Sequence, residues 1–183
     1  KEFLSDDYVM DLPKLLQQFI LRAFILPFRP SKTKEAYEKI WKEEGSPLII
    51  NTQKIANSLS EKTGWSVDIA MRYQTPSIRE RIRKFKELNI KEAVIIPLYP
   101  HHAMSTTKTT NLEIDKIISE EHPTLRAKYI EPFYNDPRYI QALSYSIKPY
   151  LNNLDKLIFS YHGIPERHLT KGDVVGNHCL KVE

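Results

Sequence analysis

Residues 92–99 read EAVIIPLY, a continuous apolar run that predicts a strand buried on both faces of a parallel sheet. Three further runs predict strands, at 66–71 (SVDIAM), 126–130 (RAKYI) and 156–161 (KLIFSY). Segments with helical periodicity lie between them and begin at Pro76, Ser105 and Asp136. Strands that alternate with helices in this way form right-handed βαβ units. The sequence therefore predicts a doubly wound α/β fold whose parallel sheet is covered by helices on both faces.

Helices are also expected ahead of the first predicted strand. Their start signals are a capping residue or an early proline, at Asp11 and Pro13, at Ser31, and at Ser46 and Pro47. The first of these helices should run to about Leu26, where Pro27 and Pro30 stop it, because a proline has no N–H to donate. Gly64 should end the third, since glycine readily adopts the left-handed conformation that closes a helix.

The composition is that of a globular protein. The chain has 183 residues, of which 41% are hydrophobic, and a formal net charge of +4. Its 27 basic and 23 acidic residues are interleaved, which favours solvated helix faces over a nucleic-acid-binding patch. The one cysteine, Cys179, excludes an internal disulfide, and no Cys-x-x-Cys pair is present to hold zinc or an iron–sulfur cluster. This cysteine usage is typical of a reducing compartment, so we expect a cytoplasmic protein.

The most apolar segment covers residues 15–28. It is shorter than the roughly 20 residues that a transmembrane helix needs, and it contains a charged residue, Arg22. A helix in the core or at the lip of a binding site is the favoured interpretation. The alternative is peripheral contact with a membrane through an apolar set formed by Phe19, Phe24, Leu26 and Phe28.

Candidate binding loops follow the predicted strands, because ligands of open parallel sheets bind beyond the carboxyl ends of the strands. These loops are MRYQTP (71–76), YPHHAMSTT (99–107), EPFY (131–134) and HGIP (162–165). They are rich in aromatic residues and histidine, and the five glycines of the chain form neither GxGxxG nor a P-loop. This argues against a nucleotide and favours a large, flat, apolar ligand. Arg72 would suit a carboxylate on the rim of that ligand, and a histidine would suit a metal ion or a proton.

Each candidate residue also has a purely structural interpretation. His162, at the end of a predicted strand, can be a structural histidine, and Arg72 can belong to a salt bridge. Ser105 and Thr106 can serve as a helix N-cap, and Tyr99 can shape its loop. Single residues therefore leave the function open, and their combination has to decide it.

The stretch SYHGIPERHLTKGD, residues 160–173, closely resembles the signature of the ferrochelatase family. Four other segments resemble blocks of the same family in the same order: FLSDDYVMDLP (3–13), PSKTKEAYEKIWKEEGSPLI (30–49), MRYQTPSI (71–78) and IIPLYPHHAMSTT (95–107). No single block is long, but five of them in order make the resemblance specific. It covers essentially all 183 residues.

The resemblance implies an enzyme, a lyase that inserts Fe²⁺ into a porphyrin during heme biosynthesis. Proteins of this family consist of two Rossmann-like halves with a cleft between them. Residues 1–183 resemble the first half, without its opening strand and without the second half, which supplies a glutamate facing the family's histidine. The chain also begins with KEFLSDDYV and ends with HCLKVE, both inside apparent elements, so we expect a fragment that can be inactive by itself.

His162 matches the histidine of the family signature, so the resemblance implies that it binds the metal or removes a pyrrole proton. The two roles stay open. We expect a strand over 156–161 to deliver His162 to the rim of the cleft. Gly163 should let the backbone turn sharply, and Pro165 should stiffen the exit.

Other site residues are likewise implied by the resemblance. Arg72 and Tyr73 match the arginine and tyrosine of the pocket wall, and Tyr37 and Ser46 match the block that orders the porphyrin side. The third group expected to bind substrate consists of Tyr99, Ser105 and Thr106. Met104 stands where some relatives have a cluster-ligating cysteine, so no iron–sulfur cluster is expected.

The expected substrates are Fe²⁺ and a porphyrin, either protoporphyrin IX or coproporphyrin III, and the residues do not choose between the two. One alternative is a non-catalytic fragment that binds porphyrin or metal. Another is a related chelatase for a different divalent metal, since imidazole accepts several such ions.

Overall fold

The computed structural model describes residues 2–152 and 155–172. These residues form two compact units. The first comprises residues 2–91 and 113–125, and the second comprises 92–112, 126–152 and 155–172. Cys179 and the last residue of the stretch 160–173 lie outside the described residues.

The first unit consists of helices and loops. Its short N-terminal segments are η1 (Phe3–Ser5), α1 (Asp7–Met10), α2 (Lys14–Ile20), η2 (Leu21–Ile25), α3 (Leu26–Phe28) and α4 (Pro30–Glu38). Its longer helices are α5 (Pro47–Thr63), α6 (Ile78–Glu87) and the greater part of α7 (Thr109–Glu121). Most of the buried apolar side chains belong to this unit, among them Leu21, Ala56, Ile69, Ile78, Ile82, Ile114, Ile117 and Leu125.

The first helical stretch passes Pro27 and ends at Phe28, two residues after the predicted end near Leu26 and before Pro30. The π-helical turn η2 ends at Ile25, two residues before the proline, and the Leu26 N–H donates to the carbonyl of Leu21. This wider turn accommodates a residue that cannot donate and whose ring crowds the preceding turn. Asp11 does not cap this helix. It closes α1 instead, in the left-handed conformation with a φ of 40°.

The boundaries predicted for α5 are confirmed. Ser46 is its N-cap, Pro47 is its first residue, and Gly64 closes it with a φ of 72°. Helix α6 begins with a reciprocal capping box, in which the Ser77 hydroxyl accepts from the Glu80 N–H and the Glu80 carboxylate accepts from the Ser77 N–H.

The strand predicted at 66–71 is not formed, apart from an isolated bridge between Met71 and Ser77. Its backbone groups find local partners instead of a neighbouring strand. The carbonyl of Ile69 accepts from Arg81 Nε at 3.0 Å, and the Met71 N–H donates to the carbonyl of Pro76 at 2.7 Å. The alternating pattern therefore corresponds here to an irregular segment in which Ile69 is buried and its neighbours Asp68 and Ala70 are exposed, and not to a strand.

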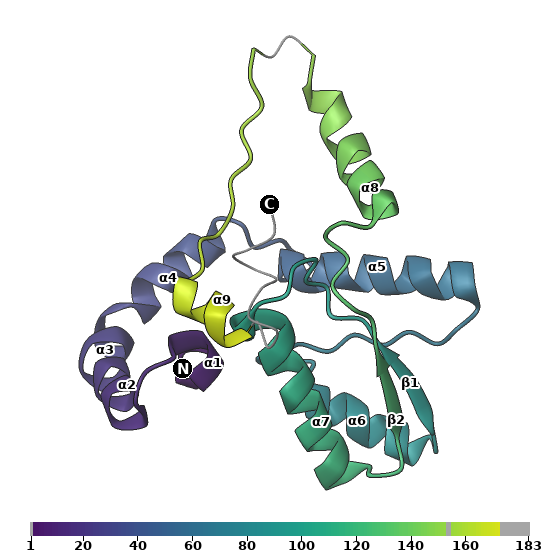
Figure 1. Ribbon diagram of the computed structural model, residues 1–183, viewed down its shortest axis with the longest axis horizontal. Coiled ribbons are helices and arrows are strands. Elements are labelled where there is room, and N and C mark those ends of the chain that lie inside the picture. Colours follow the sequence, from purple (N-terminus) through teal and green to yellow (C-terminus); the bar gives the residue numbers. More distant parts are fainter. Residues whose placement is uncertain (1, 153–154, 173–183) are drawn as a thin grey trace. The chain divides into compact units, whose positions relative to one another are not determined.

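The second unit contains a parallel pair of strands, β1 (Glu92–Ile95) and β2 (Arg126–Tyr129), seen side by side in Figure 1. Glu92 pairs with Arg126 and Ile95 with Tyr129. Strand β1 ends before Pro97, which has no N–H for a ladder. The predicted burial of β1 on both faces is wrong, because Val94 is 39% exposed. The unit also contains η3 (Met104–Lys108), α8 (Pro137–Ile147), η4 (Lys148–Tyr150) and α9 (Glu166–Gly172).

The mixture of helices with parallel strands is an α/β fold, as predicted. The strand predicted at 156–161 is absent, since residues 156–165 adopt neither helix nor strand. Ile158 in this run is 86% exposed, and Leu157, Phe159 and Tyr161 are exposed as well. In the described part of the chain the sheet thus has two strands.

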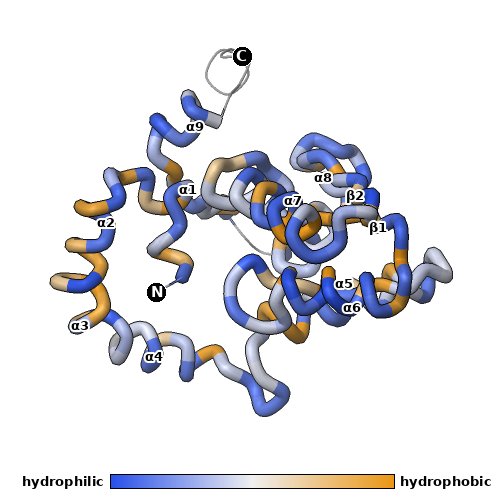
Figure 2. Tube along the Cα trace, turned by 90° about the horizontal axis from the view of Figure 1, so that it is seen from below, coloured by the Kyte–Doolittle hydropathy of each residue, from blue (hydrophilic) through white to orange (hydrophobic). Residues whose placement is uncertain are grey.

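An apolar surface follows α2, η2 and α3, visible as orange stretches in Figure 2. Its exposed members are Leu15, Leu16, Phe19, Phe24 and Phe28. Among the described residues, no helix combines the length and the apolar character needed to cross a membrane. The segment 15–28 therefore lies mostly at the surface, although Leu21 within it is buried. This argues against a core helix, and both the lip of a binding site and peripheral membrane contact stay predictions.

Candidate functional site

Arg72 and Tyr73 lie in the loop that leads into α6. The hydrogen bond between the Met71 N–H and the Pro76 carbonyl closes the base of this loop. Both side chains are partly exposed. The closed loop presents them from a defined turn rather than from a flexible segment.

Asp6 is the acceptor that holds this pair. Its Oδ2 accepts a hydrogen bond from Arg72 Nη2 at 2.6 Å and a second from the Tyr73 hydroxyl at 2.9 Å. Its Oδ1 accepts from the Tyr8 N–H at 2.8 Å and caps α1. The side chains of Asp6 and Arg72 are 6% and 13% exposed. Because so little water reaches them, the two charges depend on each other and on these additional hydrogen bonds.

Aromatic and amide side chains surround the pair. The Arg72 guanidinium carbon lies 4.6 Å from the centroid of the Tyr73 ring, a cation–π arrangement. The ring of Phe3 meets the ring of Tyr73 edge to face, with centroids 5.2 Å apart. Gln17 is fully buried, and its Nε2 donates to the carbonyl of Asp6 at 3.3 Å. The result is a cation held on an aromatic wall.

In the second unit the loops after β1 and β2 meet, as predicted for the carboxyl ends of parallel strands. The Pro100 carbonyl accepts from the N–H groups of Phe133 and Tyr134, both at 3.0 Å. The ring of His101 stacks on that of Tyr134, with centroids 5.2 Å apart. Tyr99 lies next to this junction and is exposed. These loops form a second aromatic and imidazole surface.

Ser105 and Thr106 lie in the π-helical turn η3 at the end of the same loop, and both are half-buried. Ala103 is the N-cap of this turn, so the prediction that Ser105 starts the helix is off by two residues. Helix α9 packs against η3. A Cβ on Gly172 would lie 3.4 Å from Met104 Cγ. The end of the stretch 160–172 therefore lies close to the loop that carries Ser105.

His162 is exposed, and its Nδ1 lies 2.6 Å from the carbonyl oxygen of Gly163. The expected strand before it is not formed. The structure also shows no steric requirement for glycine at position 163, because a Cβ on Gly163 would have no atom within 4 Å. In the described residues, the His162 side chain is therefore exposed, and no preceding strand fixes its orientation as the sequence analysis expected.

Tyr37 and Ser46 are not joined to the Arg72 cluster. Tyr37 is 55% exposed on α4, and Ser46 serves as the N-cap of α5 without a side-chain capping bond. In the described residues no hydrogen bond links either of them to Arg72 or Tyr73. Their predicted contact with substrate stays a prediction.

Two residues of interest were missed. Asp6 is separated from Arg72 by 66 positions, and its only local signal is its place before a helix, in SDD. His168 on α9 is 3% exposed, and among the described residues neither of its ring nitrogens has a hydrogen-bond partner. An imidazole buried in this way gives no signal in the sequence.

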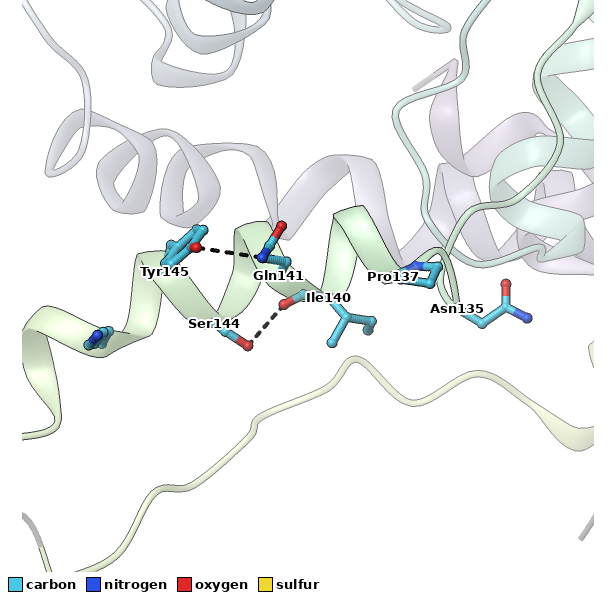
Figure 3. Close-up of a pocket in the computed structure, with 7 residues that line it drawn as sticks. Asn135, Pro137, Ile140, Gln141, Ser144 and Tyr145 are labelled. Atoms are coloured by element: carbon cyan, nitrogen blue, oxygen red, sulfur yellow. Dashed lines mark hydrogen bonds between the residues drawn. The ribbon is translucent and has the colours of Figure 1, made fainter.

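A shallow hollow of about 670 Å³ runs along α8 (Figure 3). It is lined by Asn135, Pro137, Ile140, Gln141, Ser144, Tyr145 and Lys148. None of the predicted site residues contributes to it. Within residues 2–152 and 155–172, no three His, Cys, Asp or Glu side chains gather closely enough to hold a metal ion.

These features define a class: an α/β protein whose first unit holds an arginine on an aromatic ring and whose second unit carries aromatic and imidazole side chains at the carboxyl ends of two parallel strands. The particular family follows from comparison with known proteins. A model of the ferrochelatase family matches residues 1–182, and the chain belongs to the ferrochelatase family.

Curated relatives agree with this family. The chain is 41% identical over 184 residues to the ferrochelatase of Ectopseudomonas mendocina (strain ymp), covering 98% of this chain and 53% of the relative. It is 39% identical over 186 residues to the ferrochelatase of Pseudomonas fluorescens (strain Pf0-1), covering 100% and 54%. For Stutzerimonas stutzeri (strain A1501) the identity is 40% over 184 residues, covering 98% and 53%. The chain thus spans about half the length of the curated relatives it matches.

Proposed function

We propose that the chain forms the first half of a ferrochelatase, the lyase that inserts Fe²⁺ into a porphyrin. The observation that carries the proposal is the Arg72 guanidinium on the ring of Tyr73. A porphyrin offers a flat apolar ring to aromatic side chains and carboxylates to an arginine. The family match over residues 1–182 supports the same substrate class.

The fold proposal is that β1 and β2 belong to a doubly wound, Rossmann-like sheet. The parallel pairing of the two strands, joined through η3 and α7, supports it. Strand, helix and parallel strand form the repeating unit of such sheets. Residues 1–183 would then be the first of the two halves of the protein.

The chemistry requires a base, because Fe²⁺ replaces two pyrrole protons. We assign His162 either to proton removal or to binding of the iron, since a neutral imidazole serves both purposes near pH 7. A bent macrocycle exposes its nitrogen lone pairs, so a wall that distorts the ring would speed insertion. The residues proposed to contact the porphyrin are Arg72, Tyr73, Tyr37, Ser46, Tyr99, Ser105 and Thr106.

The apolar surface on α2 to α3 has a proposed role at the lip of the porphyrin site. Its exposed phenylalanines would contact the macrocycle or the surface of a membrane from which an apolar porphyrin arrives. The proposed location is the cytoplasm, with membrane contact of the peripheral kind.

The test is a titration of the 183-residue chain with protoporphyrin IX, then with Fe²⁺ under anaerobic conditions, while the Soret and Q bands are recorded. The same titration is run on a chain extended to the length of the relatives. The proposal expects the metalloporphyrin spectrum to appear faster with the extended chain than in buffer. An extended chain that binds porphyrin but inserts no metal would refute it.

A second candidate is a half-site that binds porphyrin without inserting metal. The exposed position of His162, whose observed ring contact is with the adjacent Gly163, favours this function for the 183-residue chain. Binding without a change to the metalloporphyrin spectrum is the result expected for it. Repeating the titration with Co²⁺ and Zn²⁺ tests the related chelatases.

A further inference from the structure

We propose that Asp6 is a positioning residue for the porphyrin carboxylate. In this proposal it does not touch the substrate. It fixes the plane of the Arg72 guanidinium and the direction of the Tyr73 hydroxyl. In the proposal, these two groups contact the substrate. The inference rests on the proposed function, because it assumes that the ligand of Arg72 carries carboxylates.

The geometry of Asp6 separates two tasks between its two oxygens. Oδ1 accepts from the Tyr8 N–H and so caps α1. Oδ2 accepts from both Arg72 Nη2 and the Tyr73 hydroxyl, at 2.6 and 2.9 Å. Capping needs one oxygen, and asparagine or serine caps a helix about as well as aspartate. The second oxygen therefore has a function beyond the start of α1.

The orientation of the guanidinium follows from these contacts. A guanidinium is planar, so one short charge-assisted bond at Nη2 together with the Tyr73 ring at 4.6 Å leaves it little freedom to rotate. A carboxylate binds an arginine best in the plane of this fork. The direction from which a substrate carboxylate can approach Arg72 is thus set by Asp6.

The surroundings of Asp6 keep it in place. Its backbone carbonyl accepts from Gln17, which is fully buried, and its side chain is 6% exposed. The arginine and tyrosine come from a loop 66 and 67 positions away in the chain. Asp6 therefore joins the N-terminal helices of the first unit to the loop that carries the proposed carboxylate-binding group.

The test compares two porphyrins that differ in charge, protoporphyrin IX and its dimethyl ester. Their binding to the 183-residue chain is followed by quenching of the protein fluorescence. For Asp6→Asn we expect the dissociation constant of protoporphyrin IX to rise about tenfold, the loss of roughly one charge-assisted hydrogen bond. We expect the dissociation constant of the ester to change less than about twofold, because the ester offers no carboxylate to orient.

The matched control is Asp7→Asn, which neutralises the neighbouring carboxylate. Asp7 pairs with Lys14 at the surface, where both side chains are 60% exposed. This variant should bind both porphyrins as the unaltered chain does. Asp6→Ser is the second test variant, since serine keeps the cap of α1 and removes the carboxylate. Tyr73→Phe combined with Asp6→Asn should weaken binding by less than the product of the two single effects.

Three results would overturn the proposal. If Asp6→Asn and Asp6→Ser lower the melting temperature but bind both porphyrins normally, Asp6 has a structural role alone. If they weaken the acid and the ester equally, the effect comes from general packing. If the unaltered 183-residue chain binds neither porphyrin, Arg72 is not a carboxylate-binding group in this chain and the positioning role fails, while the titration of the extended chain decides the proposed function separately.

Discussion

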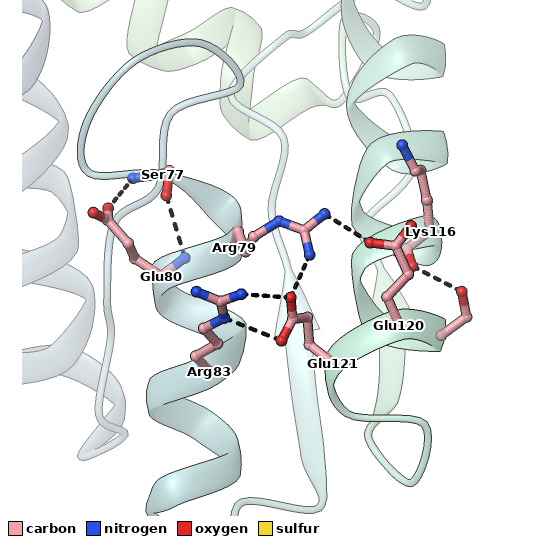
Figure 4. A network of polar contacts seen from close by, with 8 residues as sticks. Ser77, Arg79, Glu80, Arg83, Lys116, Glu120 and Glu121 are labelled. Atoms are coloured by element: carbon pink, nitrogen blue, oxygen red, sulfur yellow. Dashed lines mark hydrogen bonds and ion pairs between the residues drawn. The ribbon is translucent and has the colours of Figure 1, made fainter.

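Two regions of the molecule have environments that run against their apolar content: α6 has three apolar side chains among its ten residues, and the segment 156–165 has five among ten. Helix α6 buries Ile78 and Ile82, begins with a complete capping box and is joined to α7 by ion pairs (Figure 4). The segment 156–165, which carries His162, exposes its apolar side chains and forms no ladder. Burial is therefore decided by the partners that a segment finds and not by its composition.

The largest effect expected in this comparison is the loss of metal insertion in His162→Ala. Removing a general base lowers turnover by about 100-fold or more. The melting temperature should stay unchanged, because His162 is exposed and its observed ring contact is with Gly163. The measurement is the rate of the Soret change in a chain extended to the length of the relatives.

Ile158→Ala is the control for that experiment, since it lies in the same segment and is 86% exposed. It should retain turnover. If His162→Ala inserts iron at the normal rate, neither the base nor the iron-ligand role is correct.

A matched pair of isoleucine substitutions tests the difference in burial directly. Ile82→Ala removes a side chain that is 3% exposed on α6 and should cost about 2–5 kcal/mol of the free energy of unfolding. Ile158→Ala should change it by less than about 0.5 kcal/mol. Urea unfolding of the 183-residue chain measures both. Equal losses would mean that the segment 156–161 is buried in solution.

Caps provide a smaller test on the helical side. Ser77→Ala removes a hydroxyl that accepts from the Glu80 N–H and should destabilise the chain by about 1 kcal/mol. Ser46→Ala alters the N-cap of α5, where the side chain makes no capping bond, and should cost a few tenths of a kcal/mol at most. A larger loss for Ser46→Ala in urea unfolding would show that the α5 cap forms in solution.

Local signals explain how much the sequence could predict. Pro47 and Gly64 bound α5 as expected, and β1 and β2 lie within the predicted runs. Such signals act within a few residues of each other. The run 156–161 has the composition of a strand. A strand also needs a neighbouring strand for its backbone hydrogen bonds, and the composition of the run does not indicate which segment that would be.

The site follows the same rule. The meeting of the loops after β1 and β2 was predictable, because parallel strands end at one edge. The pairing of Asp6 with Arg72 was not, since 66 positions separate them and no local pattern links two residues that far apart. Long-range polar contacts of this kind become visible only in the fold.

The smallest expected effect concerns the ion pairs between α6 and α7. Glu121 accepts hydrogen bonds from Arg83 Nε at 3.0 Å and Nη2 at 2.8 Å, and a further bond from Arg79. These hydrogen bonds, from Arg83 first and Arg79 second, lower the pKa of Glu121 from 4.5 to about 2. A carboxylate with a lowered pKa stabilises the fold above its unfolded pKa, and this contribution disappears as the pH falls toward 2.

Glu121→Gln should therefore lower the urea midpoint modestly at pH 7, because its partners are partly exposed and screened by salt. The difference from the unaltered chain should shrink steadily between about pH 4.5 and pH 2. Glu120→Gln, which removes a carboxylate bonded to Arg79, should lower the urea midpoint at pH 7 by less than Glu121→Gln, because Glu121 is bonded to two arginines. A difference that stays constant with pH would mean that the Glu121 side chain contributes through packing and not through its charge. The contrast between α6 and the segment 156–165 would then rest on apolar burial alone.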